Sequence, residues 1–300
     1  MRTKEAIRSY AHSLNFDLVG FTDALPLSTE ADRFRSWLSA GMEGGMHWLS
    51  RRPHARYVPA DLLDGALTVI CVAMSYYSVN PRASCAARYA YGRDYHVVLA
   101  DKLTQILAFL RQADPELKAK ICVDTSPLAE KPLAHKAGLG WQGRNTLLIN
   151  DCYGSWLCLG ELIINRAYEP DQPALPRCGS CRACIEACPA GAIRDDGGLD
   201  AGRCLSSISS YDDRETVALR GSILGCDICQ NVCPFNRHPL AGREKSLLEP
   251  NPLTSLTPQE LSALSRETYE TFRKDTAFSH LPYTRFKLNL IRAGLIAPAG

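Results

Sequence analysis

The pattern of apolar and polar residues over the first 165 residues alternates between helical and extended segments. Apolar positions spaced three and four residues apart predict amphipathic helices over residues 5–14 and 95–114. Short runs rich in apolar and β-branched residues predict strands over 17–24, 68–77 and 118–124. The run 68–77 is apolar enough to be central in a sheet, and 118–124 is expected to be buried. This order of elements predicts an α+β or α/β fold for the first half of the chain.

The next segments predict a helix followed by a hairpin. Residues 128–140 predict a short helix closed by Gly138 or Gly140. Two apolar runs, 145–150 and 156–165, flank the polar segment DCYGS, and this arrangement predicts a β-hairpin.

The remaining part of the chain has weaker periodicity. Residues 168–177 are polar and rich in proline, which is typical of a linker. After a cysteine-rich stretch, residues 257–274 predict one helix, because Thr257 and Glu260 occupy capping-box positions. We therefore expect three domains, comprising residues 1–168, 169–240 and 241–300.

Composition and charge exclude several classes of protein. A chain of 300 residues with 46% hydrophobic and 22% charged residues can bury a globular core. The net charge of +2 does not indicate a general nucleic-acid binder, so a polyanionic partner would have to meet a local basic patch. The sequence lacks an apolar run long enough to span a bilayer, and its first residues do not have the apolar segment of a signal peptide. These features predict a cytoplasmic protein.

Cysteine spacing is the most specific chemical signal in the sequence. Eight of the 13 cysteines fall between Cys178 and Cys233, directly after the predicted linker. The first run, Cys178, Cys181, Cys184 and Cys188 followed by Pro189, has the C-x2-C-x2-C-x3-C-P spacing that binds a [4Fe–4S] cluster. The second run has Cys226, Cys229 and Cys233 followed by proline, but Ile223 stands where its first cysteine would be, so Cys204 is the candidate for the fourth ligand.

Two-cluster ferredoxins indicate how these ligands would be shared, because the last cysteine of each run binds the other run's cluster. On that pattern one cluster takes Cys178, Cys181, Cys184 and Cys233, and the other takes Cys188, Cys204, Cys226 and Cys229. Structural zinc is the alternative for any C-x2-C pair, but the paired C-x3-C-P endings favour iron and sulfur. The five scattered cysteines are interpreted as buried free thiols.

Two polar stretches of the first half could carry chemistry. Residues 87–96 combine arginines, tyrosines, an aspartate and His96, and residues 123–146 begin at the end of a predicted strand with Asp124. A carboxylate at that position can face a ligand, but Asp124 could equally cap the following helix. His96 and His135 are possible metal ligands, although a structural role is the simpler reading. The glycines of GLGWQGR could let the backbone approach a large flat ligand.

Six segments together resemble one known family. They are RYAYGRDYH, VDTSPLAEK, AGLGWQGRNTLLI, YGSWLCLGELI, CGSCRACIEACPAGAI and GCDICQNVCPFN, and in this order they resemble the epoxyqueuosine reductases over roughly residues 1–240. The resemblance implies an oxidoreductase whose N-terminal domain has a nitroreductase-like layout and binds base-off cobalamin, fed by two [4Fe–4S] clusters. The implied reaction reduces epoxyqueuosine to queuosine at the wobble position of the tRNAs for Tyr, His, Asp and Asn. An unidentified reductant or reductase would supply the electrons.

The resemblance also implies roles for single residues. Asp124 would donate a proton to the leaving oxygen, kept protonated by an apolar or anionic surround. Cobalamin contacts would come from Arg56, Asp94, Asp124, Leu148, Ser206 and Asp227. Because Ser206 and Asp227 follow cysteines of the second cluster, that cluster would lie nearer the corrin. Lys131, where the family often has arginine, would contact substrate or corrin amides.

The sequence departs from the family in two respects. Many members continue into a HEAT-like helical extension, which is not found here, and residues 206–223 are more acidic than a tRNA contact would favour. A basic set in the tail could still bind phosphates or could simply be solvated: Arg273, Lys274, Arg285, Lys287 and Arg292. Two other functions remain open, a dehalogenase-like corrinoid reductase of a small molecule and a ferredoxin-type electron carrier.

Overall fold

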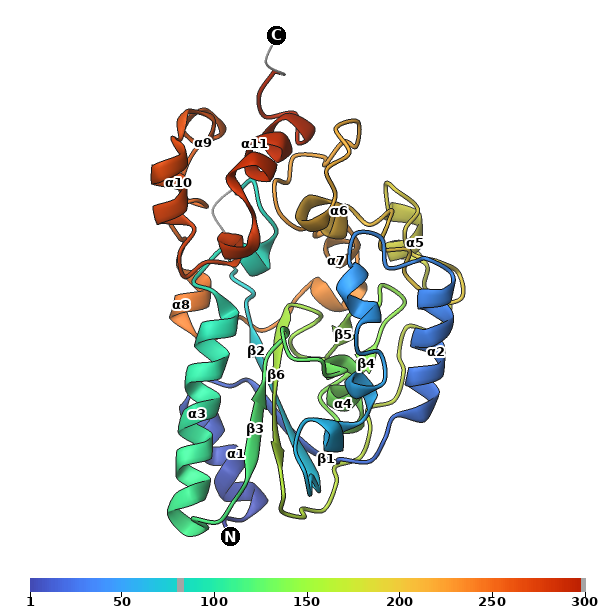
Figure 1. Cartoon of the computed structure of the whole chain (residues 1–300), viewed down its shortest axis with the longest axis vertical. Helices are drawn as coiled ribbons and strands as arrows, with labels where there is room; N and C mark the ends of the chain where they lie inside the picture. Colours follow the sequence, from blue (N-terminus) through green and yellow to red (C-terminus); the bar gives the residue numbers. More distant parts are fainter. Residues whose placement is uncertain (80–83, 298–300) are drawn as a thin grey trace.

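A four-stranded sheet forms the centre of the first half of the protein (Figure 1). The computed structural model describes residues 1–79 and 84–297. The strand order is β1 (Leu18–Asp23), β2 (Thr68–Ser75), β6 (Leu157–Ile164) and β3 (Ala119–Cys122), and every neighbouring pair is antiparallel. The fold of this half is therefore α+β.

Strand β2 explains why the sheet is covered on both faces. Alternate residues of a strand point to opposite faces, and every residue of β2 is buried. Ile70, Val72 and Met74 belong to the apolar cluster under α1 (Lys4–Ser13) and α3 (Tyr95–Ala113). Val69, Cys71 and Ala73 belong to the cluster on the other face, with α4 (Glu130–Lys136). The expectation of a central strand is confirmed, as are both long helices.

The loop between β1 and β2 adds a layer beside the sheet. It contains α2 (Ser28–Ser39) and three 3-10 helices, η1 (His47–Ser50), η2 (Ala55–Tyr57) and η3 (Pro59–Asp61). A fourth 3-10 helix, η4 (Arg88–Ala90), precedes α3.

Two expectations for this half were wrong. Strand β3 is an edge strand that pairs only with β6, so two of its four residues are half-buried and one is exposed. The predicted hairpin does not form, because β5 (Leu148–Ile149) pairs with β4 (Trp141–Gln142) in a second, two-stranded sheet. Strand β6 is apolar on both faces, and that pattern places it inside the larger sheet, between β2 and β3.

The helix at 128–140 ends as expected, with a glycine. Gly138 adopts a φ of +77°, its N–H donates to the His135 carbonyl, and the Leu139 N–H donates to the Ala134 carbonyl. This is a Schellman motif, which favours glycine because other side chains are strained in the left-handed conformation. Gly138 is therefore the residue that closes α4.

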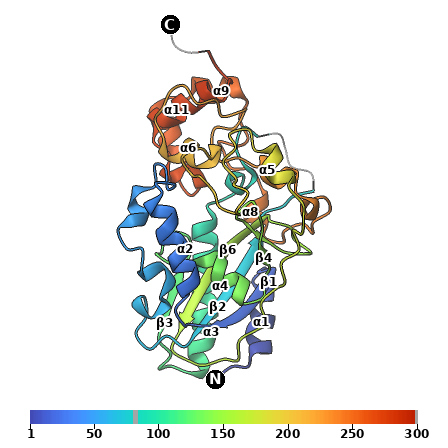
Figure 2. The ribbon, with the colours of Figure 1, turned by 90° about the vertical axis from the view of Figure 1, so that its right-hand side faces the viewer.

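The second half consists of short helices joined by loops. The cysteine-rich part contains α5 (Ala183–Ala187), α6 (Leu205–Tyr211), α7 (Ile228–Asn231) and η5 (Pro234–Asn236). The tail contains α8 (Lys245–Leu248), α9 (Pro258–Ala263), α10 (Arg266–Phe272), η6 (Ala277–His280) and α11 (Tyr283–Arg292). Figure 2 shows α9 and α11 at the end of the molecule opposite the N-terminus, with α5 and α6 between them and the sheet.

The single helix expected over 257–274 is in fact two helices. The capping box of Thr257 and Glu260 starts α9 as expected. Leu264 then leaves the helical conformation, and the Ser265 side chain accepts the Thr268 N–H to start α10. A serine at this position favours a new N-terminus over continuation of the helix.

The tail is joined to the rest of the protein by buried contacts. Leu247 belongs to the apolar cluster under α1 and α3. Asn251 donates from its side-chain amide to the carbonyls of Ala90 and Gly92, at 2.8 and 3.0 Å. The tail therefore closes one side of the junction between the sheet and the cysteine-rich part. In the described ranges, no helix is both long and apolar enough to cross a membrane.

Candidate functional site

Asp124 lies in a strained turn directly after β3. Its φ is +49°, in the left-handed region that costs a non-glycine residue about 1–3 kcal/mol. Its backbone N–H donates to Glu130 Oε1 at 2.5 Å, and its carboxylate lies 3.0 Å from His96 Nε2. The side chain is 56% exposed, so the carboxylate can reach a ligand.

The alternative that Asp124 or a neighbour caps α4 is wrong. The residue at the N-cap position is Ala129, and no side chain caps this helix end. The strain at Asp124 therefore serves to place its side chain rather than to start the helix.

His96 connects Asp124 to a second carboxylate. Asp94 is the N-cap residue of α3, and its Oδ1 lies 2.6 Å from His96 Nδ1 and also accepts the His96 N–H. Burial lowers the pKa of His96, but the hydrogen bonds and charges of Asp124 and Asp94 outweigh it and raise that pKa to about 9. At neutral pH the imidazole is therefore charged, and both ring nitrogens donate.

This arrangement changes two expectations for Asp124 and His96. Apolar or anionic groups were expected around Asp124, to keep its carboxyl protonated. On the side that faces His96 the Asp124 carboxylate instead forms an ion pair with the imidazole. His96 had been considered only as a metal ligand or structural residue, yet it holds the proton nearest to Asp124. The sequence feature that could have revealed this role is the D-x-H spacing of Asp94 and His96 at a helix start. The carboxylate of an N-cap aspartate can bond to an imidazole ring two residues later.

Two basic side chains lie on the other side of Asp124. Burial lowers the pKa of Arg56, and the charges of Asp124 and Glu130 partly restore it. Burial also lowers the pKa of Lys131, which is influenced by Glu130 and Asp124 and by Cys204 and Cys229. Lys131 is therefore close enough to both the Asp124 turn and the second cysteine group to be influenced by their charges. Within residues 1–79 and 84–297, it has no hydrogen-bond or ion-pair partner.

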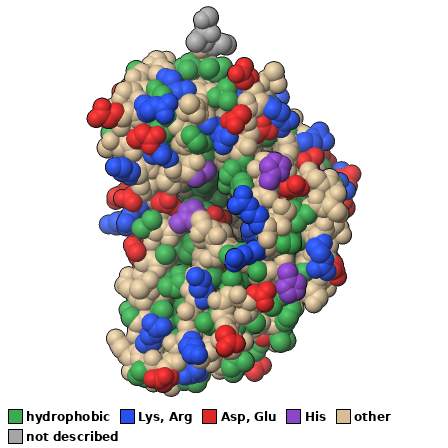
Figure 3. Space-filling view, in the orientation of Figure 1, with side chains coloured by type: hydrophobic (Ala, Val, Ile, Leu, Met, Phe, Trp, Pro, Cys, Tyr) green, Lys and Arg blue, Asp and Glu red, His purple; other side chains and the backbone are tan. Residues whose placement is uncertain are grey.

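The surface is hollowed at this junction. Figure 3 shows a depression between the sheet-containing half and the tail, with histidine side chains and lysine or arginine side chains at its margin. Two features of this site fit a large ligand with carboxamide and carboxylate groups. One is the His96–Asp124 pair, and the other is the half-buried Lys131 ammonium, which has no partner among the described residues. The donor set here is therefore compatible with a corrin.

The cysteines form two groups in space. Burial raises the pKa of the Cys233 thiol, and the neighbouring Cys178 and Cys181 raise it further. Burial, Cys178 and Cys233 raise the pKa of the Cys184 thiol in the same way.

The second group contains Cys188, Cys204, Cys226 and Cys229. Burial raises the pKa of Cys226, and Cys204 and Cys188 raise it further. Cys229 has Cys226 and Cys204 as neighbours, and Cys184 of the first group as well. The structure thus brings together the two sets of four expected from spacing, next to each other. The identity of the ligands stays a prediction.

The chemistry of these groups fits iron–sulfur clusters. Four thiolates held close repel one another unless metal charge compensates them. The backbone N–H of Ala192 donates to Cys188 Sγ at 3.3 Å, the kind of bond that tunes a cluster. The Trp141 indole N–H is buried without an acceptor in the part of the chain that is described, and its ring packs with Cys178 and Cys233.

The other residues expected to contact cobalamin have protein partners of their own. Leu148 is buried in β5, opposite Gln142. Ser206 lies in the first turn of α6, and its N–H bonds to Cys204. The Asp227 carboxylate accepts the Arg88 N–H at 2.8 Å, and burial raises its pKa. It borders a cavity of about 370 Å³ that also reaches Cys226.

The glycine-rich loop is not a platform for a flat ligand. A side chain at Gly140 would collide with the Ile149 carbonyl, and one at Gly143 with the Ile149 side chain. Both glycines therefore let this loop pack on β5. The expectation that they leave room for a ligand is not supported.

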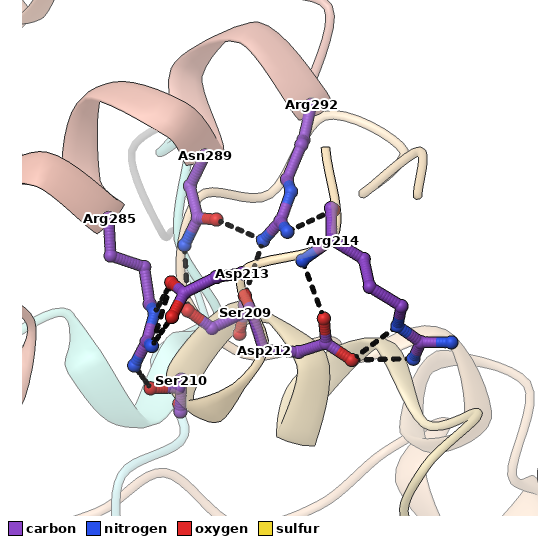
Figure 4. Close-up of polar contacts among 8 residues, drawn as sticks. All are labelled: Ser209, Ser210, Asp212, Asp213, Arg214, Arg285, Asn289 and Arg292. Carbon is purple, nitrogen blue, oxygen red and sulfur yellow. Dashed lines mark hydrogen bonds and ion pairs between the residues drawn. The ribbon is translucent and has the colours of Figure 1, made fainter. Parts of the chain in front are cut away.

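Most of the basic set in the tail is occupied within the protein. Figure 4 shows that Arg285 forms a bidentate ion pair with Asp213 and that Arg292 donates to the Asp212 carbonyl and to Asn289. Arg273 pairs with Glu270, and Lys287 donates to the Ser262 carbonyl. Of this set only Lys274 is exposed and without a described partner. These arginines instead neutralise part of the acidic segment.

Comparisons with known proteins agree on one family. Residues 56–125 match the family described as epoxyqueuosine reductase QueG, DUF1730, and residues 177–236 match the 4Fe-4S double cluster binding domain. The chain is 35% identical to the epoxyqueuosine reductase of Escherichia coli, with 95% of this chain and 79% of that protein covered. It is 33% identical to that of Cyclobacterium marinum, with 95% of each covered.

Solved structures lead to the same group. A crystal structure of epoxyqueuosine reductase with an epoxyqueuosine-modified stem loop of tRNA-Tyr superimposes with a TM-score of 0.86 at 30% identity, covering 97% of this chain and 80% of that one. The enzyme from Streptococcus thermophilus gives a TM-score of 0.85 at 28% identity, covering 98% of this chain and 81% of that one.

Proposed function

Because the chain belongs to the epoxyqueuosine reductase family, we propose that it reduces epoxyqueuosine to queuosine at the wobble position of tRNA. Membership decides against the two alternatives, a small-molecule dehalogenase and a free-standing electron carrier. The observation that supports the proposal best is the His96–Asp124 pair beside Lys131, because the Lys131 ammonium is influenced both by Asp124 and by Cys204 and Cys229 of the second cysteine group.

The reaction needs two electrons and a proton for the oxygen that leaves. Converting the epoxide to an alkene with two electrons and two protons releases that oxygen as water. The two groups of cysteines would hold two [4Fe–4S] clusters, which would supply one-electron transfer. A base-off cobalamin, when bound, supplies the low-potential cobalt chemistry at the epoxide. Arg56 and Lys131 would hold its side groups, and Leu148, Ser206 and Asp227 remain proposed contacts.

The acid in this proposal is the His96–Asp124 couple rather than Asp124 alone. His96 is charged at neutral pH and donates to Asp124, while Asp94 orients the ring through Nδ1. As negative charge develops on the leaving oxygen, His96 passes its proton to Asp124, and Asp124 delivers that proton to the oxygen. Asp94 would then act mainly on His96, with corrin contact as a further role.

The RNA partner would be bound at the rim of the hollow next to η1. Trp48 and Tyr211 are 37% and 36% exposed, and their rings meet edge to face with centroids 4.6 Å apart. Burial raises the pKa of Tyr211 and the Asp124 charge raises it further, so the Trp48–Tyr211 pair lies near Asp124. Arg51 and Arg52 follow on the same segment, are exposed, and form no ion pair with any described residue.

Aromatic rings and free arginines are the groups that bind single-stranded RNA, through stacking and phosphate contacts. We assign this rim, defined as Trp48, Arg51, Arg52 and Tyr211, to the anticodon loop that flanks the modified base. The basic set in the tail, for which phosphate binding and simple solvation were both open from the sequence, is largely paired within the protein.

The direct test is anaerobic incubation of cluster-reconstituted protein with cobalamin, a strong reductant and an anticodon stem-loop bearing epoxyqueuosine. Nucleoside mass spectrometry should show loss of one oxygen atom and formation of queuosine. Reactions without cobalamin, and with Asp124→Ala protein, are the controls. Persistence of epoxyqueuosine in the complete reaction, with clusters and cobalamin both bound, would contradict the proposal.

A further inference from the structure

Two glutamates lie next to the Asp124 turn, Glu130 half-buried and Glu161 fully buried. Glu130 is the first residue of α4, and Glu161 lies in the middle of β6. The Glu161 backbone is placed between two strands, opposite Cys71 on β2 and Cys122 on β3. Its side chain is fully buried, and neither carboxyl oxygen has a donor among the side chains and backbone groups that are described.

The Glu161 carboxyl is left with the Glu130 carboxyl as its polar neighbour, because α4 packs on β6 and brings the two groups together. Two carboxylates cannot both be ionised at that separation in a buried site, whereas a carboxylic acid can donate to a carboxylate. Burial and the charge of Glu130 raise the pKa of Glu161 well above its ordinary value, and burial and the charge of Asp124 raise that of Glu130 to about 7.

The charges around the pair decide which partner holds the proton. Arg56 and Lys131 both influence Glu130 and favour its ionised form. Around Glu161 the described neighbours are Glu130, Asp124 and two thiols, Cys71 and Cys122, and burial raises the pKa of both thiols. The remaining groups near Glu130, Cys158 and Tyr95, are also kept neutral by burial.

We infer that Glu161 and Glu130 share one proton, with Glu161 as donor, and that the Glu130 carboxylate so held is the positioning residue for Asp124. The bond that does this is the one from the Asp124 N–H to Glu130 Oε1. It fixes the φ of +49° that turns the Asp124 carboxylate toward His96. The inference rests on the proposed function, because it assigns a purpose to the orientation of Asp124.

The first test uses protein without cobalamin. Glu130→Leu removes the acceptor, so hydrogen exchange of the Asp124 amide should accelerate about 10- to 100-fold. Glu130→Gln keeps an acceptor oxygen and should stay within a few-fold of the wild type. Isotope-edited infrared spectra should show a protonated glutamic acid band at neutral pH that disappears in Glu161→Gln. Absence of that band in the wild type, or unchanged Asp124 exchange in Glu130→Leu, would overturn the inference.

The second test uses the reconstituted enzyme. Glu130→Leu should lower kcat about 10- to 100-fold with little change in KM, because it alters the acid and not the binding of RNA. Glu161→Leu removes the donor to Glu130 and should also lower kcat. In Glu161→Gln the side-chain amide can still donate to Glu130, so this variant should keep most of the wild-type kcat. Wild-type kcat should fall as the pH drops below about 7, where Glu130 also becomes protonated, and this acid limb should be missing in Glu130→Gln.

The two ideas fail in different ways. A wild-type enzyme that turns over normally, together with an unchanged kcat and pH profile in Glu130→Leu, refutes the positioning role alone. A wild-type enzyme that does not convert epoxyqueuosine refutes the proposed function, while the exchange and infrared measurements still decide whether the proton is shared. If Glu130→Leu unfolds, Glu130→Gln and the infrared band carry the test.

Discussion

At the scale of single residues, the site depends on conformations and protonation states that neighbours impose. Asp124 occupies a left-handed conformation because Glu130 accepts its N–H, and His96 keeps its charge because two carboxylates bind it. Without these neighbours, His96 and Glu130 would have ordinary pKa values. Their function arises from a chain of contacts across three elements, the β3–α4 turn, the start of α3 and β6.

The first prediction concerns Asp124. Asp124→Asn should lower turnover by about 10²- to 10⁴-fold, the usual contribution of a positioned acid, while retaining cobalamin and both clusters. The asparagine keeps the shape and the backbone N–H bond to Glu130 but cannot pass on a proton. Single-turnover conversion of the modified stem-loop measures the effect, with cobalamin absorbance as the control. Full activity in this variant would remove Asp124 from the chemistry.

The second prediction concerns the pH dependence of His96. Its folded-state pKa of about 9 lies above the ordinary 6.5, so the charged ring stabilises the folded protein below pH 6.5 and this contribution is lost between about 6.5 and 9. Turnover limited by the same proton should decline as the pH rises through about 9. His96→Asn should remove that alkaline limb from kcat, whereas His54→Asn, at an exposed histidine of the same protein, should leave it in place. An unchanged limb in His96→Asn would assign it to another group.

At the scale of elements, α11 shows how a buried amide can hold a helix in place. Asn289 is fully buried, and its side-chain nitrogen donates to the Ser209 carbonyl at 2.7 Å (Figure 4). The same nitrogen donates to the Ile223 carbonyl at 2.8 Å. It thereby joins α11 to α6 and to the segment before Cys226. The acidic residues of that segment are bound by arginines of the same region, so their charge is largely compensated.

The third prediction tests this anchor. Asn289→Ala leaves two buried carbonyls without a donor and should lower the free energy of unfolding by about 2–4 kcal/mol. Arg33→Ala, at an exposed position of α2, should change it by less than about 0.5 kcal/mol. Chemical denaturation of the reconstituted protein measures both. Equal stability of the two variants would show that α11 is held by its apolar face alone.

At the scale of the whole molecule, two paths meet at the hollow, one for electrons and one for RNA. The cysteine groups approach it from the loops around α5, α6 and α7, and Lys131 is close enough to both the second cysteine group and Asp124 to be influenced by their charges. The rim of Trp48, Arg51, Arg52 and Tyr211 approaches it from the surface. The segments that supply these parts are far apart in the sequence.

The fourth prediction concerns the electron path. Cys226→Ser should abolish electron transfer from the clusters to bound cobalt, because it removes a ligand of the cluster nearer the corrin. Cys152→Ser is the matched control, since Cys152 is exposed and outside both cysteine groups. Stopped-flow absorbance after anaerobic reduction measures the transfer. Cobalt reduction at the wild-type rate in Cys226→Ser would refute the order of the clusters.

The fifth prediction concerns RNA. Binding of the stem-loop should weaken as salt increases, and replacing Arg51 or Arg52 with alanine should each reduce the slope of log K against log salt by about 0.7. Trp48→Ala should weaken binding by about 1–3 kcal/mol with no change in slope, because stacking carries no charge. Arg111→Ala, at the far end of α3, is the control. Identical binding of all four variants would place the RNA elsewhere.

Comparison of sequence and structure shows where sequence-based inference works. The long helices, the central strand and the capping box follow from local periodicity and spacing, because the physical cause of each lies within a few residues. The assignment of the eight cysteines to two clusters stays a prediction. The hairpin at 145–165 failed because two strands can pair with different partners, and only the complete sheet selects among them. The helix over 257–274 failed at Leu264, where a local serine cap competed with continuation.

The sequence by itself determined the kind of chemistry. Cluster binding requires cysteines at particular intervals, and the motifs that identify the family can be recognised from their order along the chain. What only the tertiary structure decided is which groups act together. His96 became the partner of Asp124, Glu161 became the neighbour of Glu130, and the tail arginines were committed to the protein rather than to RNA. The reason is physical: ionisation and hydrogen bonding depend on distance and burial, and both are properties of the packed chain.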